Sequence, residues 1–164
     1  MELALVMGAQ AKCVAPQQAR GLVGGYAVAV DLTSRNWQSI AKKRGEPWTL
    51  SKGCDTFTPI GELIEPQQIG DPDAIELSLQ VNGSTRQHGF TKDMTFDVDE
   101  LIAYVSRFMT LERGDIILTG TPAGVGPLQG GDRVTAGIST GTGFQAQYTF
   151  SCEQLADNEM SWIK

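Results

Sequence analysis

Residues 25–38 read GYAVAVDLTSRNWQ, an apolar run that leads directly into a cluster of polar side chains. Val28, Val30 and Leu32 alternate with smaller residues, a pattern typical of a strand that is buried on both faces or nearly so. The strand presents Asp31 at its end. We therefore expect the fold to be organised around a buried strand that ends in a carboxylate.

A helix is expected to begin directly after this strand. Ser34 is a helix-capping residue type, so it can start a helix that carries Arg35 and Gln38. Because these two residues are three apart, they share one helical face, one turn beyond Asp31. A carboxylate, a guanidinium and an amide would then converge at the junction. The alternative is a capped junction in which Asp31 simply pairs with Arg35.

The remaining patterns predict a chain rich in strands with a few helices. We expect strands at 2–8, 75–81, 116–119, 133–138 and 144–150, helices at 16–23, 34–45 and 97–111, and a loop at 48–57. Asn82-Gly83 is a strong signal for a two-residue hairpin after the strand at 75–81. Residues 153–164 are expected to form an appended tail.

A glycine-rich loop, GTPAGVGP at 120–127, follows the strand at 116–119. Backbone N–H groups of such a loop can face a ligand anion, whereas the alternative is a plain turn. The glycine spacing differs from that of the dinucleotide fingerprint, and the Lys-Ser/Thr of a P-loop is missing. The loop is therefore a candidate anion site of another kind.

Length and charge exclude several classes of function. The chain has 164 residues, which suits one domain, and a net charge of −6. Lys and Arg are too few and too scattered for a nucleic-acid or anionic membrane surface. No apolar run approaches the roughly 20 residues of a membrane span, and residues 1–7 are too short and lack the basic leader of a signal peptide. We expect a protein that stays in the compartment where it is made, the cytoplasm.

The spacing of the cysteines and the single histidine predicts neither a disulfide framework nor a metal site. Cys13, Cys54 and Cys152 are odd in number and far apart, which favours reduced thiols over disulfides or a zinc site. His88 is the only histidine, so no two-histidine metal site is possible, and its place after Asn82-Gly83 indicates a surface hairpin residue.

Five motifs in order resemble the fumarylacetoacetate hydrolase family. They are residues 2–8 (ELALVMG), 25–38, 52–57 (KGCDTF), Asp93-Met94 and 119–126 (TGTPAGVG). The resemblance covers nearly the whole chain, from Glu2 to about Phe150. Residues 42–48 (KKRGEPW) resemble most the small branch that includes acylpyruvases and oxaloacetate decarboxylases or tautomerases.

The resemblance implies an α+β, β-rich fold, a mixed β-sheet roll with a few short helices, in a catalytic domain of residues 1–152. It implies a homodimer that holds Mg²⁺, or in its place Mn²⁺ or Ca²⁺, through acidic residues. Glu2 resembles the second acid of the family's Glu-x-Glu pair, and Asp31 resembles the Asp that follows on the next long strand. A strand points alternate residues to one side, so such a pair aims both carboxylates at one hard cation.

The same resemblance implies roles for the polar residues. Arg35, Gln38 and Lys52 would hold the oxygens of a 2-oxo acid, and Thr121 with the Gly120 loop would bind its carboxylate. Lys52 is the implied catalytic residue, which adds positive charge near an enolate or moves a proton. The implied reactions are C–C bond hydrolysis of acylpyruvates, decarboxylation of oxaloacetate and keto–enol tautomerisation, all through a metal-stabilised enolate.

The chain departs from the family pattern at its start. The first Glu of the pair would stand one residue before Met1, and the preceding segment would supply a lid with a water-activating His-Glu pair. Either the protein is a shortened member or the chain is a fragment. The alternative to an enzyme is therefore a catalytically impaired member that acts as an interaction partner or subunit.

Overall fold

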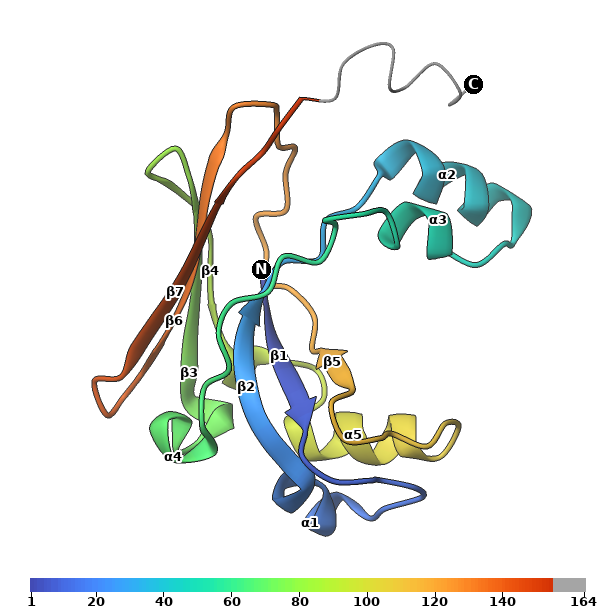
Figure 1. Ribbon diagram of the computed structural model, residues 1–164, viewed down its shortest axis with the longest axis vertical. Coiled ribbons are helices and arrows are strands. Elements are labelled where there is room, and N and C mark those ends of the chain that lie inside the picture. Colours follow the sequence, from blue (N-terminus) through green and yellow to red (C-terminus); the bar gives the residue numbers. More distant parts are fainter. Residues whose placement is uncertain (155–164) are drawn as a thin grey trace.

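The structure, a computed structural model, describes residues 1–154 and contains two antiparallel sheets (Figure 1). One sheet has the order β2-β1-β5, and its strands are β1 Glu2–Met7, β2 Val23–Ala29 and β5 Ile116–Leu118. The other has the order β4-β3-β6-β7, and its strands are β3 Ile75–Val81, β4 Ser84–Phe90, β6 Arg133–Thr140 and β7 Gln145–Ser151. A β-rich α+β fold is thus confirmed, although every pair of named strands is antiparallel where a mixed sheet was expected.

The main core lies between the two sheets. Leu3 and Leu5 of β1 point into one apolar cluster with Leu77 and Leu79 of β3. The opposite face of β1 carries Ala4, which packs in a smaller alanine-rich cluster. Both faces of β1 are therefore covered, and the strand is buried along nearly its whole length; its neighbour β2, for which burial on both faces is expected, is also buried at all but one residue.

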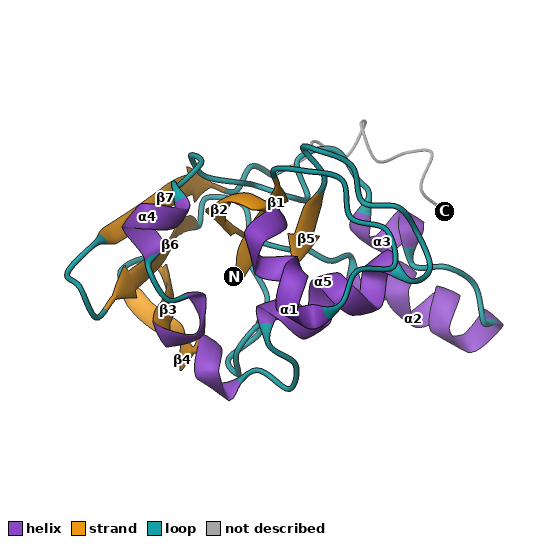
Figure 2. Ribbon diagram, turned by 90° about the horizontal axis from the view of Figure 1, so that it is seen from below, coloured by secondary structure: helices purple, strands orange, loops and turns teal. Residues whose placement is uncertain are grey.

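Short helices connect the strands. Their bounds are α1 Pro16–Ala19, α2 Arg35–Arg44, α3 Thr49–Lys52, α4 Pro66–Ile69 and α5 Val98–Ser106, with 3₁₀ turns η1 Arg20–Leu22, η2 Pro72–Ala74 and η3 Thr91–Asp93. Helices α2 and α3 lie together at one side of the sheets in both views (Figure 2). No helix in the described part of the chain has the length and apolar composition needed to cross a membrane.

Several expected boundaries are confirmed. Helix α2 begins after Ser34 and ends at Gly45, whose φ of 66° closes the helix in the left-handed conformation. The hairpin β3–β4 turns at Asn82-Gly83, where both residues have positive φ. His88 is an exposed residue of this hairpin and contacts Glu76 at 2.6 Å.

Three expectations are wrong, and each has a tertiary cause. Strand β2 ends at Ala29 rather than near residue 32, because the Val30 and Leu32 amides donate to carbonyls of residues 59 and 57 instead of pairing with β1. Helix α5 ends at Ser106 rather than 111, because Leu111 forms a bridge with Ala11. The segment 48–57 is not all loop, because α3 occupies its first half, where the Ser34 amide donates to the Ser51 carbonyl. Of the expected tail, residues 155–164 lie outside the described residues.

Arg20 joins three carboxylates from two other segments. Its Nη2 lies 2.6 Å from Asp73 Oδ2 and 3.0 Å from Asp99 Oδ2, and its Nη1 lies 3.6 Å from Asp71 Oδ1.

We expect Arg20→Gln to lower the free energy of unfolding by about 1 kcal/mol, since the side chain is 40% exposed and solvent screens the pairs. Urea unfolding at low and high salt measures this loss, which should shrink with salt.

Arg44→Gln is the matched control for this substitution. Arg44 is 67% exposed and lies 3.9 Å from one carboxylate oxygen of Glu46. We expect a change within about 0.5 kcal/mol. Equal losses in the two variants would contradict a stabilising role for the Arg20 cluster.

Candidate active site

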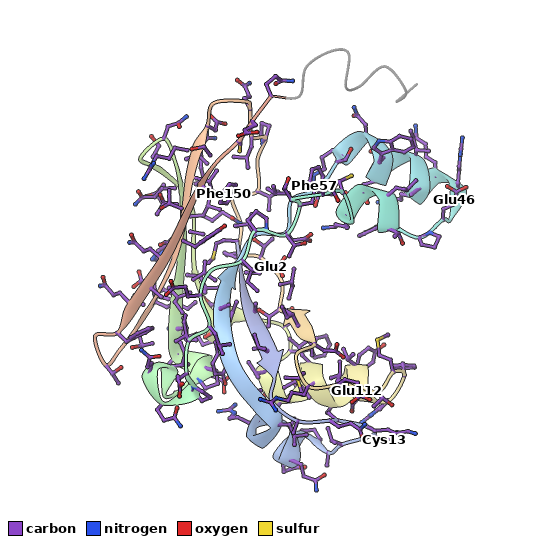
Figure 3. All side chains as sticks on the ribbon, viewed as in Figure 1. Glu2, Cys13, Glu46, Phe57, Glu112 and Phe150 are labelled. Carbon is purple, nitrogen blue, oxygen red and sulfur yellow. The ribbon has the colours of Figure 1, made fainter. Side chains whose placement is uncertain are left out.

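A cavity of about 910 Å³ opens where the start of β1 meets the connection from β2 to α2 and α3. Figure 3 shows Glu2 and Phe57 near this junction, and both residues line the cavity. Polar and charged residues on its wall come from widely separated parts of the chain: Glu2, Asp31, Thr33, Arg35, Lys52, Arg86, Gln87, Thr121, Gln129, Glu153 and Gln154. The fold therefore gathers polar groups from distant sequence positions around one space.

Lys52 and Asp31 form an ion pair on the cavity wall. The Lys52 ammonium donates to Asp31 Oδ2, and both side chains are partly buried. The pairing depends on α3, which the Ser34 amide holds by donating to the Ser51 carbonyl. The short helix therefore folds back over the strand-to-helix junction and presents Lys52 to Asp31.

Arg35 does not pair with Asp31, so the capped junction considered as an alternative is wrong. Its Nη1 donates instead to Gln38 Oε1 at 2.9 Å, as their shared helical face allows. Arg35 lines the cavity, whereas Gln38 is not among the lining residues and reaches it only through Arg35. The predicted convergence is thus met by Asp31 and Arg35 directly and by Gln38 indirectly.

Glu2 is buried at the start of β1 and accepts a 2.6 Å hydrogen bond from the Gly120 amide. Burial raises the pKa of its carboxyl, and the nearby Asp31 charge adds to this effect, while the Gly120 hydrogen bond opposes it. Gly120 adopts a φ of 99°, a conformation that favours glycine. The Gly120 N–H of the glycine-rich loop is therefore bonded to the side chain of Glu2, and binding of a ligand anion by this loop stays a prediction.

Thr121 sits next to this contact and is fixed by hydrogen bonds. Its hydroxyl donates to the Met1 carbonyl at 2.8 Å and accepts from Gln87 Nε2 at 2.8 Å. The same Gln87 nitrogen donates to the Pro122 carbonyl at 2.8 Å. Gln87 is buried, and sequence reasoning missed it. The sequence feature that could have identified Gln87 is a polar residue at an inward-facing position of the alternating hairpin strand.

The acidic groups fit a hard divalent cation of the Mg²⁺ or Mn²⁺ type. Mg²⁺ usually binds proteins through one or two carboxylates and completes its shell with water and substrate oxygens. Glu2 and Asp31 supply two carboxylates to one cavity, and their mutual repulsion would be relieved by a cation between them. Among residues 1–154, no group of three or more His, Cys, Asp or Glu side chains is placed to hold a metal.

Comparison with known proteins identifies the family. Residues 1–148 match the family described as fumarylacetoacetate (FAA) hydrolase C-terminal. The chain is 54% identical over 139 residues to the Arabidopsis thaliana protein named oxaloacetate tautomerase FAHD1, mitochondrial. The aligned residues make up 85% of this chain and 62% of that protein. The chain thus spans about 60% of the length of the curated relatives it matches.

Two solved structures share the fold. The yeast protein ynq8, a fumarylacetoacetate hydrolase family protein, superposes with a TM-score of 0.87 at 38% identity, over 93% of this chain and 66% of that one. Fumarylpyruvate hydrolase from Pseudomonas aeruginosa, solved with Mn²⁺ and pyruvate, gives a TM-score of 0.84 at 35% identity, over 93% of this chain and 64% of that one.

The comparison corrects one expectation and confirms another. The predicted cytoplasmic location is wrong, because the Arabidopsis relative and other matched proteins are named mitochondrial. Composition and cysteine spacing contain no targeting signal, so they could not predict the location. The resemblance of the five motifs is confirmed by a family match over most of the chain. This chain belongs to the fumarylacetoacetate hydrolase family.

Proposed function

We propose that this protein is a divalent-metal-dependent enzyme that acts on 2-oxo acids through an enolate. The observation that carries the proposal is the gathering of Glu2, Asp31, Arg35, Lys52 and Thr121 on the wall of one cavity. The names of the relatives support the substrate class, since they include an oxaloacetate tautomerase and a fumarylpyruvate hydrolase. We assign the catalytic domain to residues 1–152 and expect it to act as a homodimer.

Glu2 and Asp31 would hold the cation, for which Mg²⁺ is the first choice and Mn²⁺ the second. When bound, the ion supplies positive charge for the oxygen on which an enolate develops. Mn²⁺ is supported by its presence with pyruvate in the Pseudomonas aeruginosa relative. The residues of this chain do the remaining work of binding the substrate and moving protons.

Lys52 is the proposed catalytic residue. Its ammonium is held against Asp31 at the cavity wall, so it can balance negative charge on an enolate or donate a proton to it. Asp31 holds the ammonium in place. Both keto–enol exchange and protonation after decarboxylation need such a group beside the reacting carbon and oxygen.

Arg35, Gln38 and Thr121 would bind the oxygens of the 2-oxo acid. A guanidinium matches the geometry of a carboxylate, and Gln38 restricts the Arg35 side chain through their 2.9 Å hydrogen bond. The Thr121 hydroxyl is oriented by Gln87. The Gly120 amide, which bonds Glu2, orients the acidic group beside the substrate carboxylate.

The number of acidic groups favours one second candidate. Glu2, Asp31 and Glu153 line the cavity, but among residues 1–154 no three acidic side chains are grouped to hold one metal ion, whereas the family resemblance implies three acidic ligands. Loss of a metal ligand or its support commonly lowers affinity or activity about 10–100-fold. The second candidate is therefore a catalytically impaired family member that serves as an interaction partner or subunit.

One assay separates the two candidates. Turnover of oxaloacetate and acetylpyruvate is measured with Mg²⁺, with Mn²⁺ and with excess chelator. The proposal predicts turnover that depends on the added metal. No turnover of either compound under any of these conditions would reject the enzyme and favour the second candidate.

Calorimetric titration with Mg²⁺ tests the acidic pair directly. With two carboxylates we expect weak binding, with a Kd in the range of about 10⁻⁴–10⁻³ M. Binding at micromolar Mg²⁺ would contradict the idea that two protein carboxylates alone hold the ion.

A further inference from the structure

Strand β4 contains a β-bulge that falls beside the cavity. In the β3–β4 ladder, Leu79 pairs with Gln87 and Gln80 pairs with Thr85, so Arg86 is the extra residue without a partner on β3. A bulge bends its strand locally and changes the direction of a side chain, and such bulges are common beside active sites.

The bulge brings two neighbouring side chains to the same space. In a regular strand, Arg86 and Gln87 would point to opposite faces of the sheet. Both residues line the 910 Å³ cavity instead. Gln87 is buried and bonds Thr121, so Arg86 lies on the same wall, directly beside a residue that contacts the group proposed to bind substrate.

The glycine-rich loop packs directly against the bulge. A Cβ atom at Gly124 would lie 1.9 Å from the Arg86 carbonyl oxygen, and Gly124 has a φ of 101°. Only glycine allows this close approach and this backbone conformation together. The backbone of Arg86 is thus fixed relative to the loop that carries Thr121, although the Arg86 side chain remains exposed.

The other cations of the wall already have side-chain partners. Lys52 pairs with Asp31, and Arg35 bonds Gln38. Within residues 1–154, Arg86 forms no ion pair at 4.0 Å or less. Its charge does act at longer range on Asp132, whose pKa is lowered mainly by hydrogen bonds from Gln129 and Asn82 and less by Arg86.

We propose that Arg86 determines specificity by binding the second carboxylate of a 2-oxo dicarboxylate such as oxaloacetate. The inference rests on the proposed function, because it assumes that the first carboxylate and the 2-oxo group bind near Thr121 and the acidic pair. A guanidinium that is free of an ion pair can take up a carboxylate with two parallel hydrogen bonds. A substrate without the second carboxylate cannot form these hydrogen bonds with Arg86.

The test compares a substrate that has the second carboxylate with one that lacks it. In Arg86→Gln, we expect the KM for oxaloacetate to rise about tenfold, while the KM for acetylpyruvate changes less than about twofold. Arg86→Lys, which keeps the charge but not the planar pair of donors, should lie between wild type and Arg86→Gln for oxaloacetate. The kcat values should change less than KM.

Arg113→Gln is the matched control, since Arg113 is an exposed arginine away from the cavity and should leave both KM values unchanged. Circular dichroism melts of all variants verify folding. An equal rise in KM for both substrates, or no rise for oxaloacetate, would overturn the role of Arg86.

A binding measurement keeps the inference separate from the proposed function. Calorimetry with Mg²⁺ present compares oxaloacetate with pyruvate, which has a single carboxylate, in wild type and Arg86→Gln. Weaker binding of oxaloacetate alone supports the inference even if neither compound is turned over, in which case the proposed function fails by itself. Equal affinities of wild type and Arg86→Gln for oxaloacetate would reject the inference whatever the turnover.

Discussion

Lys52→Met is expected to lower kcat for oxaloacetate by about 10²–10⁴-fold, the range typical of a lost acid–base or charge-stabilising group. Methionine keeps the length of the side chain and removes its charge and its protons. Asp31 would then lose its ion-pair partner, and no other lysine lines the cavity in the part of the chain that the structure describes. Steady-state assays with saturating Mg²⁺ measure the change.

Two further variants separate the possible roles of this lysine. Lys52→Arg keeps the charge beside Asp31 but cannot readily give up a proton, so recovery of activity would indicate charge stabilisation rather than proton transfer. Lys42→Met is the control, because Lys42 is an exposed residue in the last turn of α2 and away from the cavity. A Lys52→Met protein within a few-fold of wild type would disprove the catalytic assignment.

The strand pattern predicts much of the acidic half of the site. The strand that leads to Asp31 is predicted from the alternation of Val28, Val30 and Leu32, and the strand that starts at Glu2 from its apolar composition; both strands are found. Their antiparallel register pairs Glu2 with Ala29, two residues before Asp31. The sequence shows that one acid lies at the start of a strand and the other at the end of a strand, and only the antiparallel pairing brings these two positions together.

The position of Lys52 depends on contacts that no local pattern contains. The segment around it has weak periodicity and was expected to be a loop, whereas the Ser34–Ser51 backbone bond orders it as α3. The family resemblance, rather than spacing, pointed to this lysine. Its pairing with Asp31, in place of Arg35, follows from how α3 folds back over the junction.

Arg86 and Gln87 show a second limit of prediction from the sequence. Strict alternation along β4 places these neighbours on opposite faces, so a reader of the sequence would assign at most one of them to the cavity. The bulge that places both there packs closely against Gly124 at the Arg86 carbonyl. That contact joins two residues that are 38 positions apart in the chain, so no local sequence pattern predicts it.

Asp31→Asn is expected to weaken Mg²⁺ binding about 10–100-fold and to lower kcat/KM for oxaloacetate at least as much. The substitution keeps the size of the side chain and removes one of the two carboxylates proposed to hold the cation. It also removes the charge that holds the Lys52 ammonium, so the proposed catalytic group loses its position as well as the cation. Calorimetry measures the first effect and steady-state kinetics the second.

Comparison with Glu2→Gln shows whether the two acids act together. Glu2 also accepts the Gly120 hydrogen bond, which glutamine can still accept through its amide oxygen, so the loop should stay in place. If both acids bind one ion, each variant should weaken Mg²⁺ binding, and the double variant should bind no Mg²⁺. Asp55→Asn is the control, since Asp55 is exposed and outside the cavity lining. Unchanged Mg²⁺ affinity in Asp31→Asn would show that the ion, if it binds, is held elsewhere, because a carboxylate ligand cannot be neutralised without weakening its bond to a divalent cation.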